Sequence, residues 1–372
     1  MAANAASMMG RLTIDLAALK TNWRALDRVS EGALTGAVVK ANGYGLGIGP
    51  VSRAFFGAGA RFFFTATPDE AMAVRRALPD VHIFVLDGLF PGAAELYARE
   101  KLMPALSSIE MLEEWLKLCV SAGEAYPAAL HFDTGMNRLG FRLNEAAAVK
   151  RMIGEPGFQP QMVMSHFACA DQPQHEKNRT QLALFQSVLQ QFPNIPASMS
   201  NSAGLMTGRE HHFQMVRPGI ALYGGRAVVG RRNPMTHVVT LEVPVLQVKD
   251  VRTGETVGYG ATQTFNRDSR IAILAVGYAD GFPRSLSATN TRPGGKAAFR
   301  GKIVPFAGRV SMDLIAIDVT DLGDNGPVPG EMMELLGPTL SIDDQADAAN
   351  TIGYEILTSL KGRYERVYVE EE

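Results

Sequence analysis

The sequence is poor in cysteine, which argues against two kinds of structure. Its only thiols, Cys119 and Cys169, lie far apart, and neither belongs to a CxxC motif. A disulfide framework and a thiolate metal site are therefore unsupported. The histidines His166, His175 and His211 are not spaced like metal ligands either, so the sequence predicts no zinc site.

The sequence also has no marked excess of basic or of acidic residues. The chain has 36 Lys and Arg against 38 Asp and Glu, a formal net charge of −2, and its basic residues form no run. Nothing in this balance predicts a nucleic-acid partner. No apolar run approaches the length that spans a membrane, and the opening residues Met1–Ala6 lack the basic and apolar regions of a secretion signal. These absences predict a cytoplasmic protein that acts on a small molecule.

Apolar residues are plentiful, and 372 residues with 46% hydrophobic content can bury a core large enough for two domains. Up to residue 236, apolar runs alternate with amphipathic segments, which is the βα rhythm of a parallel sheet. The predicted strands are Ala37–Val39, Phe62–Thr67, His82–Asp87, Leu102–Leu106, Ala128–Asp133, Gln161–His166, Ala197–Ser200 and a weaker one from Met215 to the turn at Arg217–Pro218. Eight such units over about 200 residues predict an α/β fold with a closed (β/α)8 barrel of the TIM type; a doubly wound open sheet is the alternative.

The chain changes character near residue 236 and then reads as strand after strand. Turn residues separate the predicted strands, which are Val238–Val251, Arg270–Tyr278, Lys296–Phe306, Ser311–Val319 and Val367–Glu370, with one helical insertion at 342–360. We therefore predict a barrel over residues 1–236 and a mostly β C-terminal domain over residues 237–372. The first strand, Leu12–Leu16, could pair with either domain.

A lysine stands where the first barrel strand is predicted to end. Lys40 follows the apolar run Ala37–Val39 and precedes a glycine-rich segment that ends at Gly47 and contains Tyr44. Because glycines let a backbone turn tightly and approach a ligand, the stretch suits a lysine held near a phosphate-bearing cofactor. Taken alone, an ordinary surface lysine in a βα loop is the simpler interpretation.

Polar groups follow the other strands at the end where a barrel carries its chemistry. Phosphate commonly binds after the seventh and eighth strands, and here Ser200–Gly204 and Arg217–Gly224 supply hydroxyl and glycine N–H groups at those places. Arg138 comes after the fifth strand, and its planar guanidinium suits a carboxylate. His166 ends the sixth strand, although a lone histidine is more often structural than catalytic.

Six motifs together resemble bacterial alanine racemase, in the family's order and over essentially the whole chain. They are AVVKANGYG at 37–45, DTGMNRLG at 133–140, SNSA at 200–203, RPGIALYG at 217–224, GYADG at 277–281 and GRVSMD at 308–313. Each motif alone is weak evidence, but the combination is specific. The resemblance implies a pyridoxal 5'-phosphate (PLP) isomerase of fold type III, a homodimer with shared active sites. It would interconvert L-alanine and D-alanine by a two-base mechanism and supply D-alanine for peptidoglycan.

The resemblance also assigns roles to individual residues. Lys40 would form the Schiff base with PLP and act as one base, while Tyr259, reaching the barrel mouth of the other subunit, would act as the opposite base. Arg217, backed by His166, would face the pyridine nitrogen. The other cofactor-binding positions would be Tyr44, Asn201, Ser202, Gly219, Ile220 and Tyr354, and the substrate-binding positions Arg138, Met312, Tyr278 and Asp313.

These residue types fit the chemistry. Racemisation removes a proton from one face of Cα and returns one to the other, so two bases on opposite sides serve it better than one. Arg217 can donate a hydrogen bond but cannot give up its proton, so it would keep the PLP ring a weak electron sink and limit side reactions.

The sequence departs from the family pattern at three positions. Gly43 and Leu46 stand where the family usually has alanine and histidine, and His131 stands where many relatives carry a lysine that becomes carbamylated and supports the substrate-binding arginine. Because a histidine cannot form that carbamate, we predict that none is present. We expect another acceptor or an anion to orient Arg138.

Other functions remain open from the residues themselves. A racemase for serine or a basic amino acid is one, although the tyrosines Tyr259, Tyr278 and Tyr354 favour a small side chain. A non-catalytic PLP-carrier barrel is another, but it should lack the β domain and the second base. A decarboxylase of the same fold type would need a cysteine near Tyr259 or Met312, where none occurs. Both a biosynthetic and a catabolic role would use the same site.

Overall fold

The computed structural model describes residues 10–154 and 158–370, and the opening segment Met1–Ala6 lies outside them. The chain divides into two compact units, which are described separately. One is Leu19–Thr236, and the other combines the N-terminal segment up to Ala18 with the chain from His237 onward. Across the described residues, no helix combines the length and apolar character needed to cross a bilayer.

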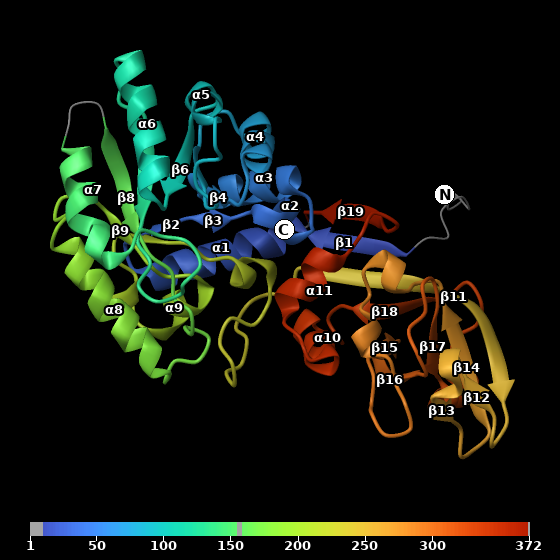
Figure 1. The fold of residues 1–372 in the computed structure, drawn as a ribbon. Coiled ribbons are helices and arrows are strands. Elements are labelled where there is room, and N and C mark those ends of the chain that lie inside the picture. Colours follow the sequence, from blue (N-terminus) through green and yellow to red (C-terminus); the bar gives the residue numbers. More distant parts are fainter. Residues whose placement is uncertain (1–9, 155–157, 371–372) are drawn as a thin grey trace. The chain divides into compact units, whose positions relative to one another are not determined.

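The unit Leu19–Thr236 is built on a parallel sheet in the order β2-β10-β9-β8-β7-β6-β5-β4-β3 (Figure 1). β2 and β3 are separated only by Gly36, and they pair with β10 and β4 respectively, so they form one interrupted strand that closes the sheet. The nine segments thus occupy eight positions around a closed barrel. The predicted (β/α)8 barrel is confirmed, and the open doubly wound sheet is wrong. The strands are β2 (Leu34–Thr35), β3 (Ala37–Val38), β4 (Phe62–Thr65), β5 (His82–Val85), β6 (Leu102–Leu106), β7 (Pro127–His131), β8 (Gln159–Met164), β9 (Ala197–Ser198) and β10 (Met215–Val216).

Gly36 is required where the closing strand is interrupted. A Cβ at this position would lie 2.5 Å from Cε2 of Phe64, a buried β4 side chain that stacks on Phe84. On one side the Gly36 N–H donates to the Val216 carbonyl at 2.9 Å, and on the other the Val39 N–H donates to the Phe64 carbonyl at 2.8 Å. The strand therefore bonds to both neighbours, and glycine lets it pass close to the Phe64 ring.

The helices of this unit follow their sequence signals. In α4 (Pro68–Ala77) proline occupies the first turn, and the Thr67 side chain caps the helix. In α6 (Ile109–Ala122) the Ser108 hydroxyl accepts from the Met111 N–H at 3.3 Å, and one face buries Leu112, Trp115 and Cys119. The remaining helices are α1 (Leu16–Ser30), α2 (Lys40–Tyr44), α3 (Ile48–Ala58), α5 (Ala94–Arg99), α7 (Ala146–Ile153), α8 (Glu176–Leu189) and α9 (Ser202–Thr207).

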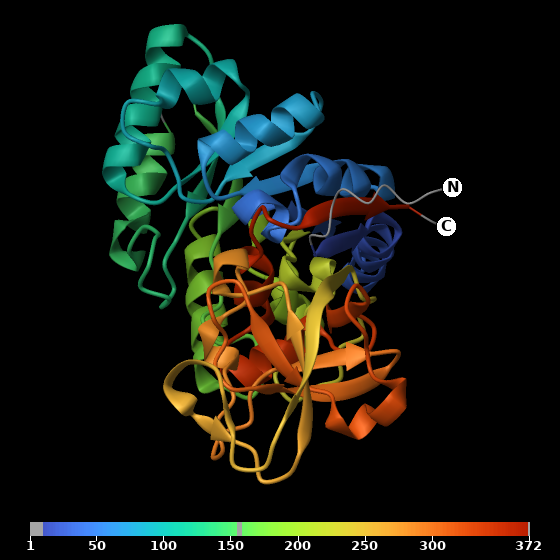
Figure 2. The same cartoon turned by 90° about the vertical axis from the view of Figure 1, so that its right-hand side faces the viewer.

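The second unit is a mostly antiparallel sheet in the order β14-β17-β16-β15-β18-β11-β1-β19. Its strands from residue 237 onward are drawn in yellow to red in Figure 2. The long strand β11 pairs with β18 on one side and with β14 on the other, so the strands between them close into a small barrel. Its strands are β1 (Arg11–Asp15), β11 (Val239–Val251), β14 (Ser269–Leu274), β15 (Lys296–Phe299), β16 (Lys302–Ala307), β17 (Ile315–Asp318), β18 (Met332–Leu336) and β19 (Glu365–Val369), beside the short hairpin β12 (Thr256–Val257) and β13 (Gln263–Thr264).

Several details of this unit complete or correct the sequence-based expectations. The first strand pairs with β11 and β19, so it belongs to the β unit. The single strand predicted at Lys296–Phe306 is a hairpin, because Arg300 and Gly301 turn the chain with φ of 47° and 78°. The insertion at 342–360 holds two helices, α10 (Ile342–Ala349) and α11 (Gly353–Ser359), since Asn350 ends the first in a left-handed conformation. β18 was not predicted.

Candidate active site

Lys40 opens a left-handed turn at the carboxyl end of β3. Ala41, Asn42 and Gly43 have φ of 53°, 55° and 65°, each with ψ of 47°, and Tyr44 continues with φ of 53°. The Gly43 N–H donates to the Val39 carbonyl at 2.8 Å, which is the helical pattern in the opposite hand. Left-handed backbone costs non-glycine residues roughly 1–2 kcal/mol each, so other contacts must hold this turn in place.

Two side chains hold the left-handed turn that begins at Lys40. The Asn42 carboxamide oxygen accepts from the Ile48 N–H at 2.9 Å and ties the turn to α3. The Glu70 carboxylate, in the first turn of α4, accepts from the N–H groups of Asn42 at 3.1 Å and Ala66 at 3.0 Å. The turn is thereby anchored to its own helix and to the next βα unit.

The Lys40 side chain is half-buried. Burial lowers the pKa of its ammonium and the nearby Arg138 charge lowers it further, while the carboxylates of Asp87 and Glu70 act in the opposite direction. A lysine with a lowered pKa has more of its amine in the neutral, nucleophilic form at neutral pH. This residue is therefore suited to condense with a carbonyl group.

Uncharged donors gather beside the turn. The Tyr44 ring stacks on Tyr223 with centroids 4.3 Å apart, and the Tyr223 hydroxyl donates to the Val38 carbonyl at 2.9 Å. The Ser202 hydroxyl oxygen accepts from the Gly219 N–H at 2.8 Å, and a Cβ added at Gly219 would overlap the Tyr44 hydroxyl. Hydroxyl and glycine N–H groups in one place form the kind of cradle that binds phosphate.

Two further predicted cofactor residues flank this cradle. Ile220 is fully buried and directly follows Gly219. Asn201 caps α9, and its side-chain oxygen accepts from the Gly204 N–H at 2.9 Å. That oxygen is therefore engaged within its own loop, which leaves its NH2 group as the donor available to a ligand.

Arg217 lies inside the barrel, with 3% of its surface exposed. Its guanidinium donates to the Ser198 hydroxyl and, at 2.7 Å, to the Ser165 carbonyl, and it lies 3.5 Å from Nδ1 of His166. Burial lowers the pKa of Arg217 to about 10, so it stays charged at neutral pH. Burial and this neighbouring charge hold the pKa of His166 well below its usual value, so the imidazole is neutral and can accept from the guanidinium.

The loop that carries Arg138 is organised by Asp133. One carboxylate oxygen accepts from the N–H groups of Gly135 and Met136 at 2.8 and 2.9 Å, and the other accepts from Asn137 at 3.0 Å. Within the described residues, the exposed Arg138 guanidinium makes no recorded hydrogen bond or ion pair. The loop is therefore preformed, and its cation is available to an anionic group.

His131 ends β7 and is buried. Burial, together with the charges of Arg217 and Arg138, lowers its pKa to about 4, so the imidazole is neutral at pH 7. Its Nδ1 has no hydrogen-bond partner among the described residues. The expectation that no carbamate forms here stays a prediction, as does the identity of the group that orients Arg138.

In the β unit, three predicted substrate-binding residues come together. The Tyr278 N–H donates to the Ser311 carbonyl at 3.0 Å, and the next N–H, of Ala279, donates to the Met312 carbonyl at 3.0 Å. Arg363 holds the Asp313 carboxylate at 2.6 Å. Met312 precedes β17 and is 52% exposed, so it is not a core residue.

Tyr259 and Tyr354 also lie in the β unit. Tyr259 is 71% exposed, so it is not a packed strand tyrosine. It stands on a turn between Gly258 and Gly260, whose φ values are 72° and 75°. Tyr354 is half-buried in the first turn of α11.

Comparison with known proteins decides the family. The profile of the alanine racemase N-terminal domain matches residues 14–227, and that of the alanine racemase C-terminal domain matches residues 238–368. The chain belongs to the alanine racemase family. A Rhizobium meliloti alanine racemase is 46% identical over 98% of this chain and 97% of its own length, and one from Rhodospirillum rubrum is 47% identical over 96% and 95%.

Solved structures give the same family. The chain is similar to a crystal structure of alanine racemase from Bartonella henselae with covalently bound pyridoxal phosphate, with a TM-score of 0.91, 38% identity, and coverage of 97% of this chain and 99% of that one.

Two relatives from Agrobacterium fabrum are alanine racemases named biosynthetic and catabolic, at 44% and 43% identity. Their near-equal identity does not distinguish the two physiological roles.

Some residues that shape this alanine racemase family site were missed in the sequence. Glu70 was visible only as an acid in a first helical turn, and nothing marked it as the anchor of the Lys40 turn. Gln181, on α8, belongs to none of the six motifs, yet its side chain is fully buried beside His166. Both are joined to the site by backbone groups distant in the chain, and such contacts leave no local signal.

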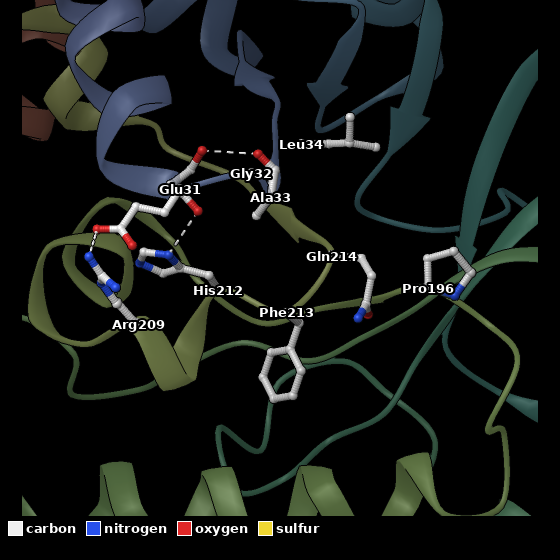
Figure 3. A pocket seen from close by; sticks show the side chains of 10 residues that line it. Glu31, Gly32, Ala33, Leu34, Pro196, Arg209, His212, Phe213 and Gln214 are labelled. Atoms are coloured by element: carbon white, nitrogen blue, oxygen red, sulfur yellow. Dashed lines mark hydrogen bonds and ion pairs between the residues drawn. The ribbon is translucent and has the colours of Figure 1, made fainter.

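A separate cavity of about 690 Å³ opens at the amino-terminal ends of β2, β9 and β10, away from the candidate site (Figure 3). Its polar groups bind one another, because Arg209 pairs with Glu31 and His212 contacts the Ser30 carbonyl at 3.2 Å. None of the predicted site residues lines it. This end of a barrel usually serves stability, in agreement with the paired groups found here.

Proposed function

We propose that this chain interconverts L-alanine and D-alanine with PLP as its cofactor. The observation that carries the proposal is the grouping, in one barrel, of a half-buried Lys40 with a lowered pKa, the Ser202 and Gly219 cradle, and the buried Arg217. Membership of the alanine racemase family supports the reaction. The racemisation of larger amino acids and the non-catalytic carrier are the alternatives.

The residues present fit PLP. The Tyr44 hydroxyl lies so close to Gly219 that a Cβ there would overlap it, and this hydroxyl, with Ser202 and Ile220 beside it, would hold the phosphate. Arg217 would donate to the ring nitrogen, held by His166 behind it. Lys40 would bind the cofactor covalently through Nζ, and Asn201 and Tyr354 would complete the binding set.

When bound, PLP withdraws electrons from Cα of the amino acid attached to it and so acidifies the Cα–H bond. Lys40 Nζ, free once the substrate amine has taken its place on the cofactor, would serve one face of Cα, because burial lowers its pKa and favours the neutral amine that can accept a proton. The hydroxyl of the partner subunit's Tyr259 serves the opposite face. Proton removal by one group and delivery by the other inverts the configuration.

The substrate carboxylate is held apart from the reacting carbon. Arg138, on its preformed loop, forms the charged contact, and the Met312 N–H adds a hydrogen bond. Tyr278 and Asp313 would complete the substrate-binding set, and the tyrosines Tyr259, Tyr278 and Tyr354 would favour a small side chain such as methyl. The charged contact with Arg138 and the limited room for the substrate side chain together would make alanine the preferred substrate.

The proposal also covers the oligomeric state, the cellular location, the physiological role and the domain boundaries. The chain works as a homodimer with shared active sites in the cytoplasm, and it supplies D-alanine for peptidoglycan. Residues 1–236, apart from the first strand, form the PLP-binding domain, and residues 237–372 form the C-terminal domain. No transmembrane segment or nucleic acid is needed for this activity.

Incubation with L-alanine in deuterated water tests the reaction. The parent enzyme should incorporate α-deuterium and accumulate D-alanine, whereas Lys40→Ala should do neither. Tyr259→Phe should lose exchange starting from one enantiomer only, which assigns the faces. A parent protein that retains PLP but exchanges no α-proton of either enantiomer would exclude racemase activity, and faster turnover of serine or lysine would assign a different substrate.

A further inference from the structure

Gln181 is a buried amide that no part of the proposed mechanism uses. It lies on α8 with no exposed surface. Its side-chain NH2 donates to the His166 carbonyl at 2.9 Å, and its oxygen accepts from the Ala168 N–H at 2.9 Å. A backbone acceptor on one side and a backbone donor on the other fix the orientation of the amide.

The second N–H of this amide reaches another loop. It donates to the Thr134 hydroxyl at 3.3 Å, and that hydroxyl lies 2.8 Å from the Ser165 hydroxyl. Thr134 and Ser165 are 2% and 1% exposed. The Ser165 carbonyl in turn accepts from Arg217 at 2.7 Å. A continuous chain of hydrogen bonds therefore joins α8, the loop after β7 and the loop after β8.

The two loops have different tasks in the proposed reaction. Thr134 follows Asp133, whose carboxylate holds the backbone as far as Asn137, so a shift at Thr134 displaces the loop that carries Arg138. His166 and Ser165 belong to the loop that fixes Arg217. Gln181 is the side chain that bonds to both loops.

We propose that Gln181 is a positioning residue that sets the distance between the carboxylate-binding Arg138 and the ring-binding Arg217. This inference rests on the proposed function. Loss of the amide leaves the partly buried His166 carbonyl and Ala168 N–H without this partner, so the two loops separate to reach water or other groups. Since Arg138 binds the substrate carboxylate in ground and transition states alike, its displacement raises KM more than it lowers kcat.

Gln181→Met tests this, because methionine has a similar length and none of the three hydrogen bonds. The matched control is Gln186→Met, at an exposed position on the same helix. With rates normalised to bound PLP, Gln181→Met should raise KM for L-alanine about tenfold, as expected for about 1.4 kcal/mol of lost binding, with a much smaller change in kcat. An unchanged KM, or an equal loss of kcat at constant KM, overturns the proposal.

Substitutions at Thr134 test the route and cover a Gln181 variant that does not fold. Thr134→Val should raise KM for L-alanine in the same way. Thr134→Ser keeps the hydroxyl and should have the KM of the parent. If Gln181 acts through Thr134, the double variant Gln181→Met/Thr134→Val should be no worse than the poorer single variant. Additive effects overturn the route.

Amide hydrogen exchange separates this inference from the proposed reaction. Residues 133–142 of the holoenzyme should exchange faster in Gln181→Met than in the parent and in Gln186→Met, whatever reaction the enzyme catalyses. Equal exchange overturns the positioning role. If Gln181→Met exchanges faster and the parent does not racemise alanine, the positioning role is supported and only the proposed reaction is excluded.

Discussion

The Glu70 carboxylate accepts a hydrogen bond from the Asn42 backbone N–H at 3.1 Å. Asn42 lies in the middle of the left-handed turn that joins Lys40 to Tyr44, whereas Glu70 lies in the first turn of the helix of the following βα unit. A strained segment is thus held by a charge from a neighbouring element. The placement of the Lys40 amine depends on this contact as well as on its own strand.

Glu70→Ala should destabilise the protein, because two backbone N–H groups lose a charged acceptor. We expect the free energy of unfolding, measured with urea, to fall by about 2–3 kcal/mol, as is typical for hydrogen bonds to a charged group. The neighbouring exposed Asp69→Ala is the control and should change it by less than about 1 kcal/mol. If the two variants unfold alike, Glu70 does not anchor the turn.

Gly219→Ala should weaken cofactor binding, since the added Cβ would overlap the Tyr44 hydroxyl. Overpacking costs about 1–3 kcal/mol, so the Kd for PLP, measured by equilibrium dialysis of the apoenzyme, should rise about 5- to 150-fold. Gly49→Ala is the matched control, because its Cβ would lie 3.6 Å from the nearest atom, on the Arg53 side chain. Unchanged PLP affinity in Gly219→Ala would place the phosphate elsewhere.

Arg217→Glu should increase transamination. A carboxylic acid can hand a proton to the ring nitrogen, whereas a guanidinium only donates a hydrogen bond, so the variant makes PLP a stronger electron sink. Pyruvate release from L-alanine, per racemisation event and per bound PLP, should rise, and Arg217→Lys should show a smaller change. Equal pyruvate release in parent and Arg217→Glu would contradict this account of the arginine.

His131 should make stability depend on pH. Its pKa is lowered from 6.5 to about 4 in the folded state, so the unfolded chain binds the proton first as the pH falls. Stability is therefore lost from about pH 6.5 downward and the loss is complete below about pH 4, which amounts to about 2 kcal/mol between pH 7 and pH 5.

His131→Gln isolates this contribution. The variant should lose about 2 kcal/mol less than the parent between pH 7 and pH 5, measured by urea unfolding at both pH values. His82→Gln, at an exposed histidine, should behave like the parent. A parent and His131→Gln with parallel pH dependence would mean that His131 titrates normally in the folded protein.

Much of the fold and of the candidate site was predictable. The barrel strands followed from apolar runs that alternate with amphipathic segments. Lys40, Ser202 and Arg217 stood out because parallel strands bring their carboxyl ends to one edge. β18 and the role of Gln181 were missed, because each depends on a partner distant in the sequence. The hairpin at Arg300 and Gly301 pairs neighbouring residues and was missed because a non-glycine residue such as Arg300 seldom adopts a positive φ.

By itself, the sequence determined the order of strands and helices, the change of architecture near residue 236 and the family, because periodicity and motifs are local properties of the chain. Only the tertiary structure decided that Gly36 lets one strand close the barrel, that the Lys40 turn is left-handed and that the first strand joins the β unit. Each of these depends on a group distant in the chain, namely the Phe64 ring, the Glu70 carboxylate, or the strands β11 and β19, and such groups meet only when the whole chain packs.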